Sequence, residues 1–267
     1  MGGSWPVDLA AYDRLLTLPG AGWAWEFMRR NPALKKARRS ESAVRARISR
    51  RTDGSVVCRL SQRCHIAESF GLHFIPDPAC CAFEAELFWL PDVMSASFDA
   101  MAEFNSTPAN TPQRFSWDKL PGEKLFLIAP GRRDKLVIRA PGYAAQLALD
   151  GAGALIAQSV SITLRVGADR LEMKSLQQLE EFGRACGGLA PRRKPLRGAR
   201  PEKLRDALIA LDGELSGIPR KRIGEAIFGS ARVRGGWDDS NESYKKRTKR
   251  LVEKGLGLMS SHYRKLL

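Results

Sequence analysis

Apolar residues at the N-terminal end of the chain recur every three to four positions, which is the spacing of amphipathic helices. Asp8 can cap a first helix, which Pro19 would end. Residues 23–30 predict a second helix with a dense aromatic cluster, and residues 33–51 predict a third, strongly basic helix with a thin apolar face. We therefore expect residues 1–55 to form a helical segment.

The pattern changes in residues 56–190, where short apolar runs are separated by turns containing Gly, Pro and Asp. Residues 143–149 fit either a helix or a strand, whereas residues 176–186 have helical spacing. The runs with the character of strands are residues 124–129, 135–139 and 159–166. Because little helix lies between these runs, the sequence predicts a small domain with a mixed or antiparallel sheet and not a Rossmann-type domain.

Residues 191–201 are rich in Pro, Gly and basic side chains, and we expect them to link the sheet to a C-terminal domain, residues 202–267. This domain begins with a leucine stripe at helical spacing, and Pro219 suits the first turn of its second helix. Gly224 lowers the helix propensity there by about 1 kcal/mol, so we expect another helix to cross closely. Residues 230–237 predict a turn before a third helix, in which Thr248, Leu251, Val252 and Gly255 share one face and the basic residues lie outside it. The leucines of the stripe are Leu204, Leu208, Leu211 and Leu215.

The charge of the chain is strongly positive and unevenly distributed. Lys and Arg number 44 against 29 Asp and Glu, so the formal net charge is +15. Residues 1–55 hold 11 basic and 5 acidic side chains, and residues 191–267 hold 20 and 9, whereas the middle is close to neutral. This asymmetry favours a polyanionic partner, most often nucleic acid, over a merely solvated basic surface.

Three C-terminal helices joined by a tight turn are typical of a helix-turn-helix DNA reader, and the whole chain is predicted to be α+β. Basic side chains of the second and third helices would neutralise phosphates, and polar residues near the start of the third helix would reach base edges. The alternative is a small three-helix domain that binds protein. The candidate DNA-binding residues are Arg220, Lys221, Arg222, Ser240, Asn241, Ser243, Lys245, Lys246, Arg247, Lys249 and Arg250.

Several of these segments resemble a known family. Residues 223–229 (Ile-Gly-Glu-Ala-Ile-Phe-Gly), Trp237, residues 249–252 and residues 263–267 resemble a group of proteobacterial regulator-like proteins, and residues 23–32 resemble their N-terminal companion domain. The combination is similar to FseA-type transcriptional activators of integrative and conjugative elements. This resemblance implies helix-turn-helix DNA binding without catalysis, activation of excision or transfer genes, and control by a small antiactivator protein.

Residue types that often carry catalysis or bind metal are present without the necessary spacing. The cysteines and histidines of the middle region contain no CxxC pair, and adjacent Cys80 and Cys81 are poorly placed for one tetrahedral ion. Glycine-rich phosphate loops are also missing from the sequence. We therefore expect no metal, no cofactor and no enzymatic activity.

The composition favours a cytoplasmic protein. The sequence has neither a secretory signal pattern nor the run of about 18–20 apolar residues that a membrane helix needs, so its five cysteines are expected to be free thiols. The predicted function is DNA-binding transcriptional regulation, with an activator as the leading form. The alternative is an antiactivator-like protein-interaction module that keeps the helix-turn-helix fold without specific DNA binding. Double-stranded DNA is the expected partner, and an antiactivator, RNA polymerase and a second copy of the chain are further candidates.

The aromatic cluster in residues 23–30 has no local core large enough to bury it. We expect it to pack on the middle domain or on a second protein, because helical spacing is more typical of such packing than of a stacking platform for single-stranded nucleic acid.

Overall fold

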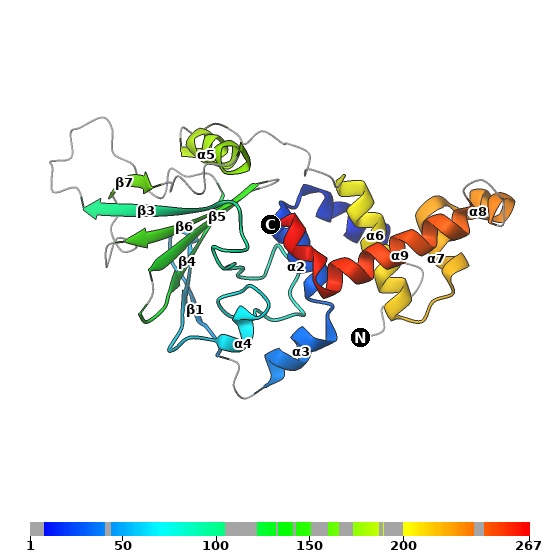
Figure 1. The fold of residues 1–267 in the computed structure, drawn as a ribbon, viewed down its shortest axis with the longest axis horizontal. Helices are drawn as coiled ribbons and strands as arrows, with labels where there is room; N and C mark the ends of the chain where they lie inside the picture. Colours follow the sequence, from blue (N-terminus) through cyan, green and yellow to red (C-terminus); the bar gives the residue numbers. More distant parts are fainter. Residues whose placement is uncertain are drawn as a thin grey trace.

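The computed structural model describes residues 8–40, 44–104, 122–131, 133–140, 143–150, 160–165, 173–186, 189, 200–237 and 243–267. The fold is α+β, as predicted. In Figure 1 a twisted sheet lies at one end of the molecule, and helices from both ends of the chain form the other.

The N-terminal segment begins with short helices and ends with a strand. The helices are α1 (Leu9–Asp13), the 3-10 helix η1 (Arg14–Thr17), α2 (Gly20–Met28) and α3 (Pro32–Arg39). The carboxylate of Asp8 accepts a hydrogen bond from the backbone N–H of Ala10, which confirms the predicted cap. The prediction that the third helix continues to residue 51 was wrong, because α3 ends at Arg39 and residues 47–50 form the strand β1 (Arg47–Arg50). This strand forms because it pairs with the strand over residues 56–59, and such pairing cannot be recognised from helical periodicity within one segment.

The described strands form one sheet of mixed direction, with the order β1-β2-β4-β5-β6-β3-β7. The pairs β2/β4 and β6/β3 are parallel, and the other neighbouring pairs are antiparallel. The ambiguous run at residues 143–149 is a strand, and β3 is a further strand that the apolar pattern did not predict. The remaining strands are β2 (Val56–Arg59), β3 (Ser97–Phe104), β4 (Glu123–Ile128), β5 (Asp134–Ala140), β6 (Tyr143–Asp150) and β7 (Val160–Arg165).

Alternating side chains give the sheet two buried faces. On one face, Phe126, Leu136 and Ile138 pack with Phe182 of helix α5 (Met173–Cys186), which covers this side. On the other face, Leu125 and Leu127 pack against loop residues of the chain between β2 and β3, a stretch that also contains the short helix α4 (His65–Glu68). Neighbouring residues of β4 therefore serve two separate cores, as the period of two in a strand requires.

A third core joins both ends of the chain to the loops beside the sheet. Trp23, Trp25, Phe27 and Met28 of α2 are fully buried in it, together with Leu204 and Leu208 from the C-terminal helices. This burial confirms that the aromatic cluster packs within the chain, and it leaves none of these rings exposed for stacking on a nucleic acid.

The C-terminal part consists of α6 (Pro201–Leu215), α7 (Arg220–Phe228), α8 (Ser230–Gly236), α9 (Tyr244–Ser260) and the 3-10 helix η4 (His262–Leu266). The predicted turn over residues 230–237 was wrong, because most of it is the helix α8. Three leucines of the predicted stripe are buried, but Leu215 is 47% exposed because it is the last residue of α6. The close helix crossing expected at Gly224 is present, since a Cβ there would lie 2.9 Å from Oγ1 of Thr248 in α9.

Candidate nucleic-acid interface

Helices α7 and α8 lie at the end of the molecule opposite the sheet, and the basic first half of α9 adjoins them (Figure 1). They are held there by a small core in which Ile223 of α7 and Val252 of α9 pack against Ala210 of α6. The exposed surface of this end is therefore presented by a packed scaffold and not by loops.

Helix α9 has one packed face and one basic face. Thr248, Val252 and Gly255 of the predicted apolar face are buried, Leu251 is half-buried, and Leu258 extends the face. The hydroxyl of Thr248 donates to the backbone oxygen of Tyr244 within the helix, so this buried polar group is satisfied. The predicted basic residues on the opposite side are all exposed: Lys245, Lys246, Arg247, Lys249 and Arg250.

Arg247 differs from the other basic residues of α9 because aromatic rings hold its side chain. Its guanidinium carbon lies 4.5 Å from the ring centroid of Phe228 and 5.2 Å from that of Tyr244. The two rings are themselves 5.3 Å apart. Such cation–π contacts contribute about 0.5–1 kcal/mol at exposed sites, so Arg247 links the end of α7 to the start of α9 while its charge stays at the surface.

Two of the three candidate residues on α7 have acidic partners in the structure. Arg220 forms an ion pair with Glu214 at 3.0 Å, and Arg222 pairs with Glu225 at 3.1 Å. The hydrogen bonds that Arg220 donates to Glu214 raise the pKa of Arg220, which keeps this guanidinium charged. Lys221 is exposed between them. Exposed pairs of this kind stabilise by about 0–1 kcal/mol, so a phosphate can compete for these arginines.

Helix α8 contributes two basic residues that the sequence interpretation missed, Arg232 and Arg234. Both are exposed, and Val233 between them is fully buried and anchors the helix. Gly229 joins α7 to α8 with φ of +90°, a backbone conformation that favours glycine. The signal in the sequence was weak, because α8 has one buried side chain and ends in two glycines.

The polar candidates before α9 are only partly described. Ser240 and Asn241 lie outside the described residues. Ser243 is the N-cap of α9, where its hydroxyl accepts from the backbone N–H of Lys246 at 3.3 Å, and it is 5% exposed. Its oxygen is thus engaged as the cap of α9, and a contact of Ser243 with DNA stays a prediction.

The electrostatic character of this end is strongly positive. Within residues 220–237 and 243–250, the described side chains include ten basic residues and one acidic residue, Glu225. Further along α9, burial and, secondarily, the charge of Lys203 lower the pKa of Lys254. Surfaces rich in Lys and Arg attract phosphates, and binding of nucleic acid to such surfaces depends steeply on salt because counterions are released.

The described part of the chain was also searched for metal-binding clusters, membrane-spanning helices and cysteines with a shifted pKa. No cluster of three or more His, Cys, Asp or Glu side chains there could hold a metal ion, and no described helix is long and apolar enough to cross a membrane. Cys58 is buried in the sheet core, where desolvation and the nearby Glu86 raise the pKa of its thiol to about 12.

Two family comparisons match this chain. Residues 7–60 match the family described as a proteobacterial transcriptional regulator-like domain. Residues 165–267, which include α5 and all the C-terminal helices, match the family described as a T6SS transcription factor DNA-binding domain. No curated protein matches the chain. Both families point to a non-enzymatic role, and together they indicate a transcriptional regulator with a DNA-binding domain, for which DNA is the supported partner.

Proposed function

We propose that the protein is a sequence-specific transcriptional regulator that binds double-stranded DNA through residues 202–267. The observation that carries this proposal is the one-sided placement of charge on α9. Five basic side chains are exposed on one face while the other face packs on the scaffold. This segment lies within residues 165–267, which match a DNA-binding family.

Within this surface we assign base reading to α8 and phosphate binding to α9. A helix-turn-helix reader places the second helix of its two-helix unit in the major groove. The unit formed by α7, Gly229 and α8 has this order, and Arg232 and Arg234 are exposed on its second helix. The guanidinium of arginine can donate two hydrogen bonds to the O6 and N7 atoms of guanine, which is the commonest base-specific contact.

The assignment to α8 changes the interpretation from the sequence, which located base reading at the start of the third predicted helix. The basic face of α9 remains the phosphate-binding surface in both interpretations. Lys245, Lys246, Lys249 and Arg250 would then position the protein on the duplex without reading its sequence.

We further propose that the protein acts as an activator of excision or transfer genes on a mobile element. This finer role is supported by the resemblance to FseA-type activators. An activator needs a surface for RNA polymerase or another protein in addition to DNA, and an antiactivator would act by covering either surface. Repression, and targets outside mobile elements, are the competing outcomes.

The test begins with genome-wide occupancy of the tagged full-length protein, which identifies the promoters it contacts. A labelled fragment from the strongest peak is then challenged with excess random duplex at about 150 mM salt, where charges more than about 8 Å apart are screened. A specific regulator prefers its site by about 10³-fold or more. Displacement by an equal amount of random duplex, for every promoter tried, would instead support the protein-interaction module.

A further inference from the structure

The strand β1 lies at one margin of the sheet, and among the described strands it pairs with β2 alone. Just beyond this pair, the backbone N–H of Arg51 donates to the backbone oxygen of Ser55 at 2.8 Å. The residues that exchange hydrogen bonds alternate along an antiparallel pair. Counted back from Arg51 in steps of two, alternate residues of β1 therefore direct their backbone groups to β2. The other two, Ile48 and Arg50, direct their N–H and C=O groups to the outer side, where no described strand pairs with them.

Both faces of β1 are open to solvent, since all four of its residues are exposed. Ile48 presents an apolar side chain, 46% exposed, beside the open backbone groups. A strand with free donors and free acceptors along one side is a template for an added strand. The backbone of DNA offers acceptors but no donors for the carbonyl oxygens, so an extended peptide fits this edge better than a nucleic acid does.

The charge around β1 is positive and is not balanced by the described residues. Arg47 lies directly opposite Arg59 of β2, and both side chains are exposed. Like charges directly opposite each other destabilise a sheet, and neither guanidinium has an acidic partner in the described part of the chain. Arg45 and Arg50, on either side of Arg47 in the sequence, are also exposed and form no ion pair with a described residue. These four arginines would be neutralised by carboxylates from outside the chain.

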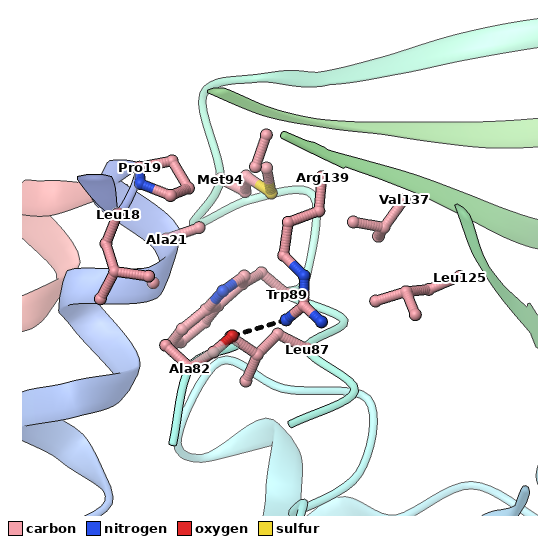
Figure 2. Close-up of a pocket in the computed structure, with 12 residues that line it drawn as sticks. Leu18, Pro19, Ala21, Ala82, Leu87, Trp89, Met94, Leu125, Val137 and Arg139 are labelled. Atoms are coloured by element: carbon pink, nitrogen blue, oxygen red, sulfur yellow. Dashed lines mark hydrogen bonds between the residues drawn. The ribbon is translucent and has the colours of Figure 1, made fainter. Parts of the chain in front are cut away.

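Several arginines elsewhere in the structure contrast with this group because the protein itself engages them. Arg139 of β5 donates to Glu123 at 3.0 Å, and it also donates to the backbone oxygen of Ala82, the bond drawn in Figure 2. Arg63 pairs with Glu68 at 2.6 Å. The unpaired positive charge beside β1 is therefore a local feature of this edge and not a general property of the arginines in the sheet and its loops.

We propose that β1 is a docking strand for an acidic, extended segment of another protein, which adds to the sheet beside it. Backbone hydrogen bonds with Ile48 and Arg50 would align the segment, and its carboxylates would lie next to Arg47 and relieve the repulsion from Arg59. Strand addition takes its affinity from such main-chain bonds and its specificity from alternate side chains. A second copy of the chain is disfavoured, because it would bring the same arginines against β1. The surface lies away from α8, so the proposal is independent of DNA binding (Figure 1).

The experiment uses full-length, ¹⁵N-labelled protein and a fluorescent peptide that alternates Glu and Val, with seven residues and Glu at both ends. The matched control is the same peptide with N-methyl groups on its three central residues, which keeps the charge but blocks backbone pairing along both edges. We expect saturable binding of the first peptide, measured by fluorescence anisotropy, and much weaker binding of the second. Hydrogen exchange, followed by NMR, should slow at the N–H groups of Ile48 and Arg50. Equal binding of the two peptides, or no saturable binding of the first, would overturn the proposal.

A pair of charge-reversal variants tests the place of binding. Arg47→Glu combined with Arg59→Glu should weaken the acidic peptide about tenfold or more, since each exposed ion pair is worth up to about fivefold. The same variant should bind the counterpart peptide that alternates Lys and Val. Arg232→Glu combined with Arg234→Glu in α8 changes the net charge equally and should leave the acidic peptide unaffected. If both double variants weaken it to the same degree, overall charge attracts the peptide and the assignment to β1 is wrong.

Two other occupants of this edge have distinct signatures. Slower exchange at Ile48 and Arg50 with random DNA duplex, and not with the acidic peptide, would assign the edge to nucleic acid. Slower exchange that rises with protein concentration alone, together with a larger mass in analytical ultracentrifugation, would assign it to a second copy of the chain. Either result would contradict the proposal. The comparison of the two peptides on the parent protein needs no variant, so it remains decisive if a charge-reversal variant misfolds.

Discussion

The guanidinium of Arg30 in α2 forms a two-pronged ion pair with the carboxylate of Asp212 in α6, 182 positions further along the chain. Nη2 of Arg30 donates to Oδ2 of Asp212 at 2.7 Å, and Nε donates to Oδ1. The hydroxyl of Tyr12 donates to the same carboxylate at 2.7 Å, and Glu26 accepts a hydrogen bond from Arg30. Burial by itself lowers the pKa of Arg30, but the hydrogen bonds that it donates to Asp212 and Glu26, together with their negative charge, outweigh burial and raise the pKa overall. The N-terminal and C-terminal helices are thus joined by a charged network as well as by the shared core.

This network leads to the first prediction. Asp212→Asn keeps the shape of the side chain but removes the charge that faces Arg30, and breaking a buried pair is strongly destabilising. Because Glu26 still faces Arg30, we expect a loss of about 2–4 kcal/mol in the free energy of unfolding, measured by urea denaturation. The control is Asp13→Asn, which breaks the more exposed pair with Arg205 and should cost less than about 1 kcal/mol. A smaller loss for Asp212→Asn than for Asp13→Asn would show that the network does not hold the two ends together.

The second prediction concerns the contact between α6 and α9. A Cβ at Gly255 would lie 2.7 Å from the backbone oxygen of Ala207 and 2.9 Å from Cβ of Leu211. Alanine is the better helix former by about 1 kcal/mol, but neither neighbour can move without shifting α6. We expect Gly255→Ala to destabilise the protein by about 1–3 kcal/mol.

The matched control for Gly255 is Gly183 in α5, where an added Cβ would meet nothing within 4 Å. Gly183→Ala should be neutral or stabilising by up to about 1 kcal/mol. Thermal unfolding of the two variants beside the parent protein measures both effects. A Gly255→Ala variant as stable as Gly183→Ala would mean that the helices are less closely packed than the structure has them.

Local periodicity was sufficient to predict elements whose neighbours are close in sequence. The faces of α9 were predicted correctly because Thr248, Val252 and Gly255 recur at helical spacing and the basic residues fall outside their arc. The strands β4, β5 and β7 were also indicated by their turns and apolar runs. In each case the information lies within one element and its flanking turns.

Elements that depend on distant partners were missed. The strand β1 is exposed along its whole length and has no apolar face, so only its pairing with β2 identifies it. A usable signal was present in the turn between them, where Asp53 accepts from the backbone N–H of Ser55 and Gly54 has φ of +79°. An Asp-Gly pair between two short runs is a hairpin signal.

The candidate site was predicted in its charge but not in its geometry. The basic face of α9 followed from sequence, whereas Arg232 and Arg234 were hidden because α8 is short and contributes one buried side chain, Val233. The capping role of Ser243 could have been anticipated, since Ser, Thr, Asp and Asn at the start of a helix usually satisfy its free N–H groups. The burial of α2 against α6 could not have been anticipated from the sequence, because it depends on contacts between residues about 180 positions apart.

The third prediction tests the basic face of α9. Changing Lys245, Lys246, Lys249 and Arg250 together to Ala should abolish measurable DNA binding at physiological salt, because each lost phosphate contact lowers the slope of log affinity against log salt by about 0.9. The four positions are exposed, so each change should alter stability by less than about 0.5 kcal/mol. Fluorescence anisotropy with a labelled duplex at several salt concentrations measures the slope, and circular dichroism checks the fold.

A control with the same change in net charge comes from another part of the molecule. Lys35, Lys36, Arg47 and Arg50 are exposed on α3 and β1, far from α8 (Figure 1). Their combined change to Ala should leave the salt slope close to that of the parent protein. If both quadruple variants lower affinity equally, total charge and not the face of α9 governs binding.

The fourth prediction separates base reading by α8 from phosphate binding by α9. Arg232→Ala and Arg234→Ala, made singly, should each reduce the preference for the promoter over random duplex by about 5- to 150-fold, the worth of one bidentate contact to guanine at about 1–3 kcal/mol. Binding to random duplex should change little, because it depends on phosphates. Lys265→Ala in η4 removes one exposed charge away from this surface and is the control, with no effect expected on either affinity. The measurement is a pair of titrations, promoter and random duplex, on each variant. Equal loss of promoter and random affinity in the α8 variants would assign α8 to the phosphate backbone, and base reading would then have to come from residues outside α8.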